Sequence, residues 1–181
     1  MNGIDKRAAA KVSMTEFSLC DDFRTPSAVF NALSLKFGPF NLDVAASDIN
    51  HLCQNYFTFN NENDNGLIHN WRGVVWCNPP YDNIKEWVQK TIKEVKEGLT
   101  QSNCERVLML IPFYSDISYF HDLILPNINH LVLIRGRVNF EGPFSTAGGA
   151  SRNPSAAFVF DKQKLPLKVH SMDNKGRWLN E

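Results

Sequence analysis

The sequence lacks any hydrophobic run long enough to cross a membrane. Its longest apolar run is the eight residues from Val107 to Tyr114, which include Pro112, whereas a transmembrane helix needs about 20 residues. The N-terminal residues carry charges with no apolar stretch behind them, so we expect no secretory signal. We therefore predict a cytoplasmic protein with no membrane partner.

Paired cysteines, clustered histidines and excess charge are also missing. No two of the four cysteines have CxxC spacing, so we expect reduced structural cysteines. None of the five histidines lies at metal-ligand spacing, and we predict no metal site. A net charge of zero argues against a histone-like protein. Residues 131–181, however, carry 8 basic and 4 acidic side chains, which suits a local phosphate-facing surface.

Short apolar segments alternate with amphipathic ones, a pattern that predicts an α/β domain. The first helix is expected over 26–37, because Thr25 can cap it and Pro26 fits its first position. The other expected helices are 84–97 and 117–126, and the expected strands are 40–45, 55–59, 73–77, 107–111, 130–134 and 156–160. No clear helix separates the last two strands. We therefore predict a mostly parallel sheet with an antiparallel terminal hairpin.

A chain of 181 residues is one domain's length. We expect a loose arm over residues 1–18, a domain over 19–165 and a C-terminal tail over 166–181, which could be an extra strand, an arm or a docking segment. In parallel sheets, ligands bind beyond the carboxyl ends of the strands. Asp43 and Asn78 lie at such ends of two expected strands.

The most specific motif is the tetrapeptide Asn78-Pro79-Pro80-Tyr81. The Asn78 side-chain oxygen and the Pro79 carbonyl can accept hydrogen bonds from both N–H bonds of an amino group, and proline fixes the direction of that carbonyl. Tyr81 offers a ring for stacking on a planar substrate. Because two such acceptors would free the lone pair of a conjugated amino nitrogen, the motif predicts methylation of that nitrogen. The competing interpretation is a rigid turn after a strand.

Further motifs surround the tetrapeptide in a fixed order. They are Asp22-Phe23-Arg24-Thr25-Pro26, Leu42 to Ala46, Asp64 to Leu67 with Trp71, Trp76-Cys77, Ile84 to Val88, Ile111-Pro112, Arg135 to Phe140 and Pro154 to Ala156. With them the chain resembles the phage-type DNA N6-adenine methyltransferases, which use S-adenosylmethionine. The resemblance implies a Rossmann-like methyltransferase fold and direct methylation of N6 of adenine in double-stranded DNA.

The resemblance also implies a site for S-adenosylmethionine. Its residues would be Thr25 and Pro26 at the edge of the methionine part, Asp43, Val44 and Ala45 along the methionine and ribose, and Asp64 at the adenine end. Taken alone, Thr25 and Pro26 also fit a helix start, and Asp64 also fits a turn. The acidic residue that holds the ribose hydroxyls stays open between Asp48 and Glu62.

Recognition of DNA needs further residues. Because the target amine lies inside the duplex, such an enzyme would flip the base into its pocket. We expect Arg135, Arg137 and Arg152 to contact phosphates or the neighbours of the flipped base, with Arg152 in a mobile loop over 142–154. The alternative for Arg135 and Arg137 is ion pairing with acidic side chains of the fold itself.

Other functions remain open from the sequence. Cytosine N4, an RNA base and a protein glutamine amide also present a conjugated nitrogen that this motif could serve. A non-catalytic cofactor-binding or DNA-binding module is a further alternative, although it would not need both acceptors of the tetrapeptide. The recognition sequence and the oligomeric state do not follow from the residues. The resemblance implies a purpose in a bacterial host, namely modification of phage or prophage DNA, for example to evade restriction.

Overall fold

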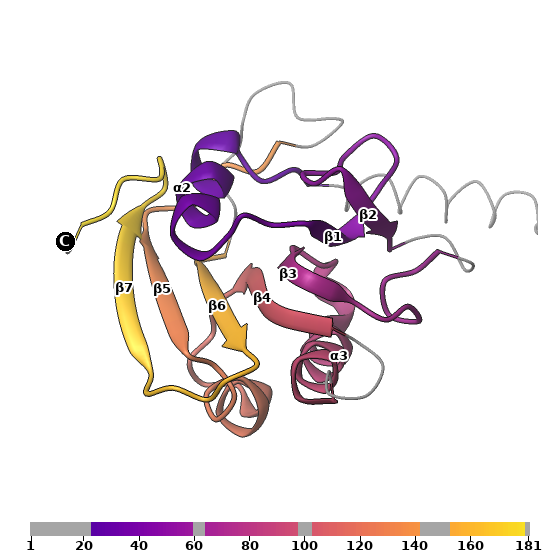
Figure 1. The fold of residues 1–181 in the computed structure, drawn as a ribbon. Helices are drawn as coiled ribbons and strands as arrows, with labels where there is room; N and C mark the ends of the chain where they lie inside the picture. The colour runs from indigo at the N-terminus through magenta and orange to yellow at the C-terminus, as the bar shows by residue number, and fades with distance from the viewer. Residues whose placement is uncertain (1–22, 60–63, 98–102, 142–152, 180–181) are drawn as a thin grey trace, which may run out of the picture.

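A computed structural model of the chain describes residues 23–59, 64–97, 103–141 and 153–179. They form a seven-stranded sheet in the order β2-β1-β3-β4-β6-β5-β7, with helices on both faces (Figure 1). The strands are β1 (Leu42–Ala46), β2 (Asn55–Thr58), β3 (Arg72–Cys77), β4 (Asn103–Pro112), β5 (His130–Arg135), β6 (Ser155–Asp161) and β7 (Lys168–Asp173). The helices are α2 (Ser27–Phe37), η1 (Tyr81–Asn83), α3 (Ile84–Glu97) and η2 (Phe120–Ile124). In these ranges no helix is long and apolar enough to cross a membrane.

The pairing of the strands confirms the predicted fold class. The pairs β1–β2, β1–β3, β3–β4 and β5–β7 are parallel. Strand β6 lies between β4 and β5 and is antiparallel to both, which is the predicted terminal hairpin. A mostly parallel sheet covered by helices, with one antiparallel strand inserted, is the Rossmann-like methyltransferase architecture that the resemblance implied.

The sheet continues past residue 165, where the domain was predicted to end. Strand β7 pairs in parallel with β5 along its whole length, from His130 opposite Lys168 to Arg135 opposite Asp173. Residues 177–179 then fold back on β7, where the Leu179 N–H donates to the Ser171 carbonyl at 2.8 Å. Of the three interpretations of the tail, the extra strand is the one present. The arm predicted over 1–18 lies outside the described residues.

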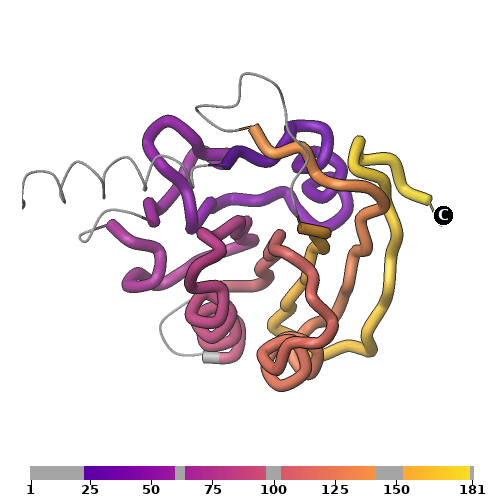
Figure 2. Tube along the Cα trace, turned by 180° about the vertical axis from the view of Figure 1, so that it is seen from behind, coloured from indigo at the N-terminus to yellow at the C-terminus, as the bar shows by residue number. Residues whose placement is uncertain are grey.

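Alternate residues of the central strands enter two cores on opposite faces of the sheet, as the period of a strand requires. On β4, Val107, Met109 and Ile111 enter the core under α3 and η2, and Leu108 and Leu110 enter the core under α2. All five are fully buried. Figure 2 shows α2 on one face of the sheet and the other helices on the opposite face. We call these the α3-side core and the α2-side core.

Two helices differ from expectation. Thr25 was predicted to cap α2, but the N-cap residue is Pro26, no side chain caps the helix, and the Pro26 carbonyl accepts from the N–H groups of Val29 and Phe30. The helix predicted over 117–126 is the short π-helix η2. The Leu125 N–H donates to the carbonyl of Phe120, five residues back, so the turn is wider than α-helical.

Gly66 brings the loop after residue 64 against the central sheet. A Cβ atom on Gly66 would lie 2.0 Å from the Val44 carbonyl oxygen of β1, so no side chain fits there. The Gly66 carbonyl accepts from the indole N–H of Trp71 at 2.8 Å, and the Trp71 backbone N–H donates to buried Glu94 of α3 at 2.9 Å. The packing of Gly66 against β1 and the hydrogen bond of Trp71 to α3 therefore hold this loop in place.

His130, at the start of β5, is held between the neighbouring strands. Its Nδ1 lies 3.0 Å from Nε2 of His170 on β7, and its Nε2 lies 3.8 Å from a carboxylate oxygen of Asp161 on β6. Burial lowers the pKa of His130, and the nearby charges of His170, Arg106 and Lys168 lower it further, against the raising effect of Asp161. The folded protein therefore favours neutral His130.

This preference predicts a pH-dependent stability. As pH falls below about 6.5, the unfolded chain protonates this histidine before the folded protein does, so stability that is complete above that pH is lost below it. We expect the free energy of unfolding of His130→Gln, measured in urea, to fall less between about pH 7.5 and about pH 5.5 than that of the unmodified protein. His121→Gln, at an exposed histidine, is the control. Parallel curves for His130→Gln and the unmodified protein would contradict the assignment.

Candidate active site

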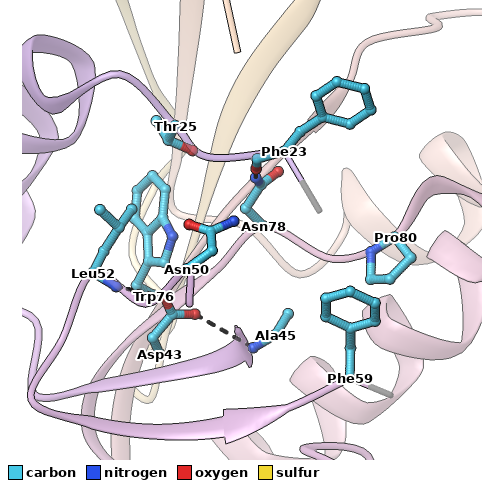
Figure 3. A pocket seen from close by; sticks show the side chains of 10 residues that line it. All are labelled: Phe23, Thr25, Asp43, Ala45, Asn50, Leu52, Phe59, Trp76, Asn78 and Pro80. Atoms are coloured by element: carbon cyan, nitrogen blue, oxygen red, sulfur yellow. Dashed lines mark hydrogen bonds between the residues drawn. The ribbon is translucent and has the colours of Figure 1, made fainter. Parts of the chain in front are cut away.

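A pocket lies beside β1 and β3, towards the carboxyl ends of these strands, and we call it the first pocket. Its lining comes from both strands, from the loop after β1 and from the segment before α2 (Figure 3). The lining residues are Phe23, Thr25, Asp43, Ala45, Asn50, Leu52, Phe59, Trp76, Asn78 and Pro80. This edge of the sheet is where ligands bind in open α/β folds. The structure thus brings together five predicted residues from three separate segments: Thr25, Asp43, Ala45, Asn78 and Pro80.

Asp43 supplies a buried carboxylate to this pocket. It is 4% exposed, and it accepts hydrogen bonds from the backbone N–H groups of Leu52 at 3.0 Å and Ala45 at 3.4 Å. Burial, followed by the negative charge of Asp43, raises the pKa of Cys53 to about 12. The same two causes raise the pKa of Cys77. Both thiols therefore stay protonated, while the carboxylate places negative charge at the pocket wall.

Thr25 supplies a hydroxyl that lacks a hydrogen-bond partner. The side chain is 1% exposed, and its Oγ1 is buried without a partner within the described part of the chain. A buried hydroxyl without a partner costs free energy unless something else bonds to it. Because Thr25 lines the first pocket and does not cap α2, this atom is available to a ligand there.

Asn78 sits where β3 stops. Pro79 and Pro80 follow it directly, and the lack of an N–H on proline ends the strand at Cys77. The Asn78 Nδ2 group donates to the Phe23 carbonyl at 3.2 Å, and this bond turns the amide so that Oδ1 is the free end. Among the residues that the structure covers, that oxygen is buried and has no hydrogen-bond partner. The amide therefore holds an unused acceptor at the wall of the first pocket.

A second pocket adjoins the first. It is lined by Phe23, Asn78, Pro79, Pro80 and Tyr81, so three residues, Phe23, Asn78 and Pro80, form walls of both pockets. Burial, with Tyr114 nearby, raises the pKa of Tyr81, so its hydroxyl stays protonated. The whole predicted tetrapeptide thus lies in the second pocket, with Asn78 at the boundary between the two.

Three of the predicted cofactor residues do not line the first pocket. Pro26 starts α2, and Val44 is fully buried in the α3-side core, because successive residues of a strand point to opposite faces. The Asp64 Oδ1 atom lies 3.6 Å from Nε2 of His69, and the Asp64 backbone carbonyl accepts from the N–H of Thr58 at 2.9 Å. Asp64 is therefore close to the neighbour of Phe59 in sequence, but it does not line the pocket. Of the two ribose alternatives, Asp48 accepts from the Tyr56 hydroxyl at 3.2 Å, and residue 62 lies outside the described ranges.

Sequence reasoning missed Asn50, Leu52 and Phe59. Phe59 comes directly after β2 and donates its N–H to the Ala46 carbonyl of β1 at 3.1 Å, so the carboxyl-end rule that selected Asp43 and Asn78 would also have selected it. Asn50 lies in a turn where its backbone exchanges two hydrogen bonds with Ser47. No sequence signal singles out Asn50 or Leu52, because a loop of ordinary composition carries them.

The predicted DNA contacts Arg135 and Arg137 lie at the end of β5, and both are exposed. Neither forms an ion pair within the described ranges, so the structure gives no support to the alternative that they pair inside the fold. Arg152 and the loop predicted over 142–154, except its last two residues, lie outside the described residues. In the same ranges, no three His, Cys, Asp or Glu side chains come together in a group that could hold a metal ion.

Comparison with known proteins shows the family of this chain. The family model for DNA N-6-adenine-methyltransferase (Dam) matches residues 12–180. The DNA N-6-adenine-methyltransferase of Haemophilus phage HP1 is 26% identical over 175 residues, which are 91% of this chain and 96% of that protein. The DNA N-6-adenine-methyltransferase of Escherichia phage T1 is 26% identical over 113 residues, which are 61% of this chain but only 43% of that longer protein. Since the family match covers nearly the whole chain, the protein belongs to the DNA N-6-adenine-methyltransferase (Dam) family.

Proposed function

We propose that this protein methylates N6 of adenine in double-stranded DNA, with S-adenosylmethionine in the first pocket and the flipped adenine in the second. One observation carries the proposal: the buried Oδ1 of Asn78 has no hydrogen-bond partner in the described structure and stands in the wall that both pockets share. The membership of the Dam family supports adenine as the acceptor.

The first pocket suits the proposed cofactor. S-adenosylmethionine carries a positive sulfonium and a positive ammonium group, and Asp43 places a buried carboxylate in the lining. The unpartnered hydroxyl of Thr25 can bond to a polar group of the same ligand, and Phe59 and Trp76 provide apolar surface for its carbon skeleton. When bound, the cofactor supplies an electrophilic methyl group.

The second pocket suits an amino group on a flat ring. The N6 nitrogen of adenine is a weak nucleophile because its lone pair is delocalised into the ring. Asn78 Oδ1 and the Pro79 carbonyl can accept from its two N–H bonds, which favours a pyramidal nitrogen with a free lone pair. As the N–C bond forms and the C–S bond breaks, these acceptors stabilise the positive charge on N6, and one N6 proton then leaves to water.

The rings beside the two acceptors can hold the base in place. Tyr81 and Phe23 both line the second pocket, and Phe23 is 44% exposed, which leaves its ring accessible to a stacking partner. Taking a base out of the duplex costs a few kcal/mol of stacking and pairing. Stacking on aromatic side chains returns about 1–3 kcal/mol per base.

Nucleoside mass spectrometry tests the proposal directly. Unmethylated double-stranded DNA is incubated with the protein and S-adenosylmethionine, digested, and its nucleosides are separated by mass. N6-methyladenine is the expected product. If the product is N4-methylcytosine, or if RNA or protein is methylated and DNA is not, then adenine is not the acceptor. Calorimetry that detected no binding of S-adenosylmethionine would instead favour a non-catalytic module.

Phosphate contacts predict a change in the salt dependence of DNA binding. If Arg135 or Arg137 neutralises a phosphate, its replacement by alanine lowers the slope of log K against log salt by about 0.9 and weakens binding to all sequences alike. Arg72→Ala is the matched control. Arg72 is exposed at the amino end of β3, whereas Arg135 and Arg137 lie at the carboxyl end of β5. A slope unchanged in Arg135→Ala and Arg137→Ala would remove these residues from the interface. Fluorescence anisotropy of labelled DNA at several salt concentrations measures this slope.

A further inference from the structure

The segment that leaves β5 returns to the active site. Val138 and Phe140 anchor it in the α2-side core, where they are 0% and 6% exposed. At its end, Glu141 forms an isolated antiparallel bridge with Arg24. Figure 2 shows this segment, in orange, running to the first described residues of the chain, in indigo. We call residues 136–141 the strap.

The strap and Asn78 are joined through a single peptide unit. The Arg24 N–H donates to the Glu141 carbonyl at 2.7 Å. The Phe23 carbonyl, at the other end of the same peptide unit, accepts from Asn78 Nδ2 at 3.2 Å. Because a peptide unit is planar, fixing the direction of its N–H also fixes the direction of its C=O. In Figure 3 the Asn78 amide lies against the backbone at Phe23.

The orientation of this amide decides whether Asn78 can act. A side-chain amide has an acceptor oxygen and a donor nitrogen on nearly equal arms, and a rotation by half a turn exchanges them. Only the oxygen can accept an N–H bond of the target amine. Since the Phe23 carbonyl can only accept, it selects the orientation in which Nδ2 faces Phe23 and Oδ1 stays free.

We propose that the strap is a positioning element: through the Glu141–Arg24 bridge it directs the Phe23 carbonyl, which holds the Asn78 amide in its catalytic orientation. The inference rests on the proposed function for the word catalytic, whereas the hydrogen bonds from Glu141 to Asn78 are described by the structure itself. The second hydrogen bond of the bridge, from the Glu141 N–H to the Arg24 carbonyl at 2.9 Å, keeps the two segments in register. Hydrogen bonds in such a chain also polarise one another.

Two proline variants break the bridge, and each has an alanine control. Arg24→Pro removes the donor to the Glu141 carbonyl, and Glu141→Pro removes the donor to the Arg24 carbonyl. Arg24→Ala and Glu141→Ala remove the same side chains but keep the N–H groups. The readout is the NMR signal of the Asn78 side-chain amide in protein labelled with ¹⁵N-asparagine, assigned by its absence in Asn78→Ala.

We expect the two amide proton shifts of Asn78 to move towards those of a solvated asparagine in both proline variants and to stay in place in both alanine variants. An Asn78 signal that is the same in all four variants overturns the proposal. If the proline variants do not fold, Val138→Ala, which loosens the strap, is compared with Val95→Ala, which makes a similar cavity under α3. Only Val138→Ala is expected to move the signal, and equal spectra would again overturn the proposal.

The kinetic readout separates this proposal from the proposed function. The NMR comparison uses neither DNA nor cofactor, so it tests the strap even if adenine is not the acceptor. Where methylation is observed, we expect the proline variants to lower kcat at least tenfold relative to their alanine controls, with KM for DNA unchanged within about twofold. A change confined to KM would assign the bridge to substrate binding and overturn the positioning role.

Discussion

Asn78→Ala is expected to lower the rate of methyl transfer by about 100- to 1000-fold, the usual effect of removing one preorganised hydrogen-bonding group from the transition state. The alanine removes the free Oδ1 acceptor, so the N6 nitrogen keeps its delocalised lone pair. Asn78 is only half-buried and gives one hydrogen bond to Phe23, so the fold should survive. Single-turnover methylation of an oligonucleotide measures the rate.

Asn83→Ala serves as the matched control. Asn83 is an exposed asparagine in the neighbouring helix η1, outside both pockets, and its side chain bonds only to Glu86 in the described structure. Its rate should stay within about twofold of the unmodified protein. Calorimetry should show that Asn78→Ala still binds S-adenosylmethionine. If Asn78→Ala unfolds the protein, the tetrapeptide is a structural turn, and the catalytic assignment is wrong.

Asp43→Asn is expected to weaken the binding of S-adenosylmethionine by about 10- to 100-fold. The substitution keeps the shape of the side chain but removes a buried negative charge from a pocket proposed to hold the positive sulfonium and ammonium groups of the cofactor. Losing one partner of a buried charge pair costs about 2–5 kcal/mol when the other charge stays unpaired, and the ligand's remaining exposure to water reduces that cost. Isothermal titration calorimetry gives the affinity.

Asp64→Asn is the informative comparison for this measurement. Asp64 was also predicted to bind the cofactor, but it lies outside the lining of the first pocket, with its side chain 45% exposed. We therefore expect a small change in affinity for Asp64→Asn. A large loss in Asp64→Asn with unchanged binding in Asp43→Asn would reverse the two assignments. Thermal unfolding checks that Asp43→Asn, which changes the acceptor of the Ala45 and Leu52 N–H groups, has not opened the fold.

The sheet was predictable because its central strands contain short apolar runs. In β4, for example, the uninterrupted apolar run from Val107 to Ile111 predicts a strand that is buried on both faces, and all five residues are buried. The first four residues of β4 were missed because three of them, Asn103, Glu105 and Arg106, are polar and exposed or half-exposed, although Cys104 is buried. Strand β7 was left undecided for the same reason, since at the edge of the sheet its first two side chains are exposed. A hydrophobic pattern in the sequence indicates buried strands, whereas strands at the edge of a sheet are less buried and show a weaker pattern.

The site was predictable where a strand end or a motif shared with the resembled family marked it. Asn78 follows from the rule for carboxyl ends, because the two prolines of the tetrapeptide fix where β3 stops. Asp43 is the second residue of β1 and reaches the pocket because it lies opposite Trp76, near the end of β3. Thr25 had two interpretations, a cap of α2 and a residue of the cofactor site; no side chain caps α2, and Thr25 lines the first pocket. The bond from Asn78 to the Phe23 carbonyl joins residues 55 positions apart, and no local pattern encodes it.

The shared walls of the two pockets have a consequence for inhibition. Any ligand that shifts Phe23, Asn78 or Pro80 from one side also reshapes the other side, so occupancy of the two pockets is thermodynamically linked. Linkage is reciprocal: the factor by which one ligand changes the affinity of the second equals the factor by which the second changes the first. A single compound that joins an adenosyl group to an adenine through a short tether could fill both pockets at once. In a series of such compounds, the tether length that gives the highest affinity would report the distance between the pockets.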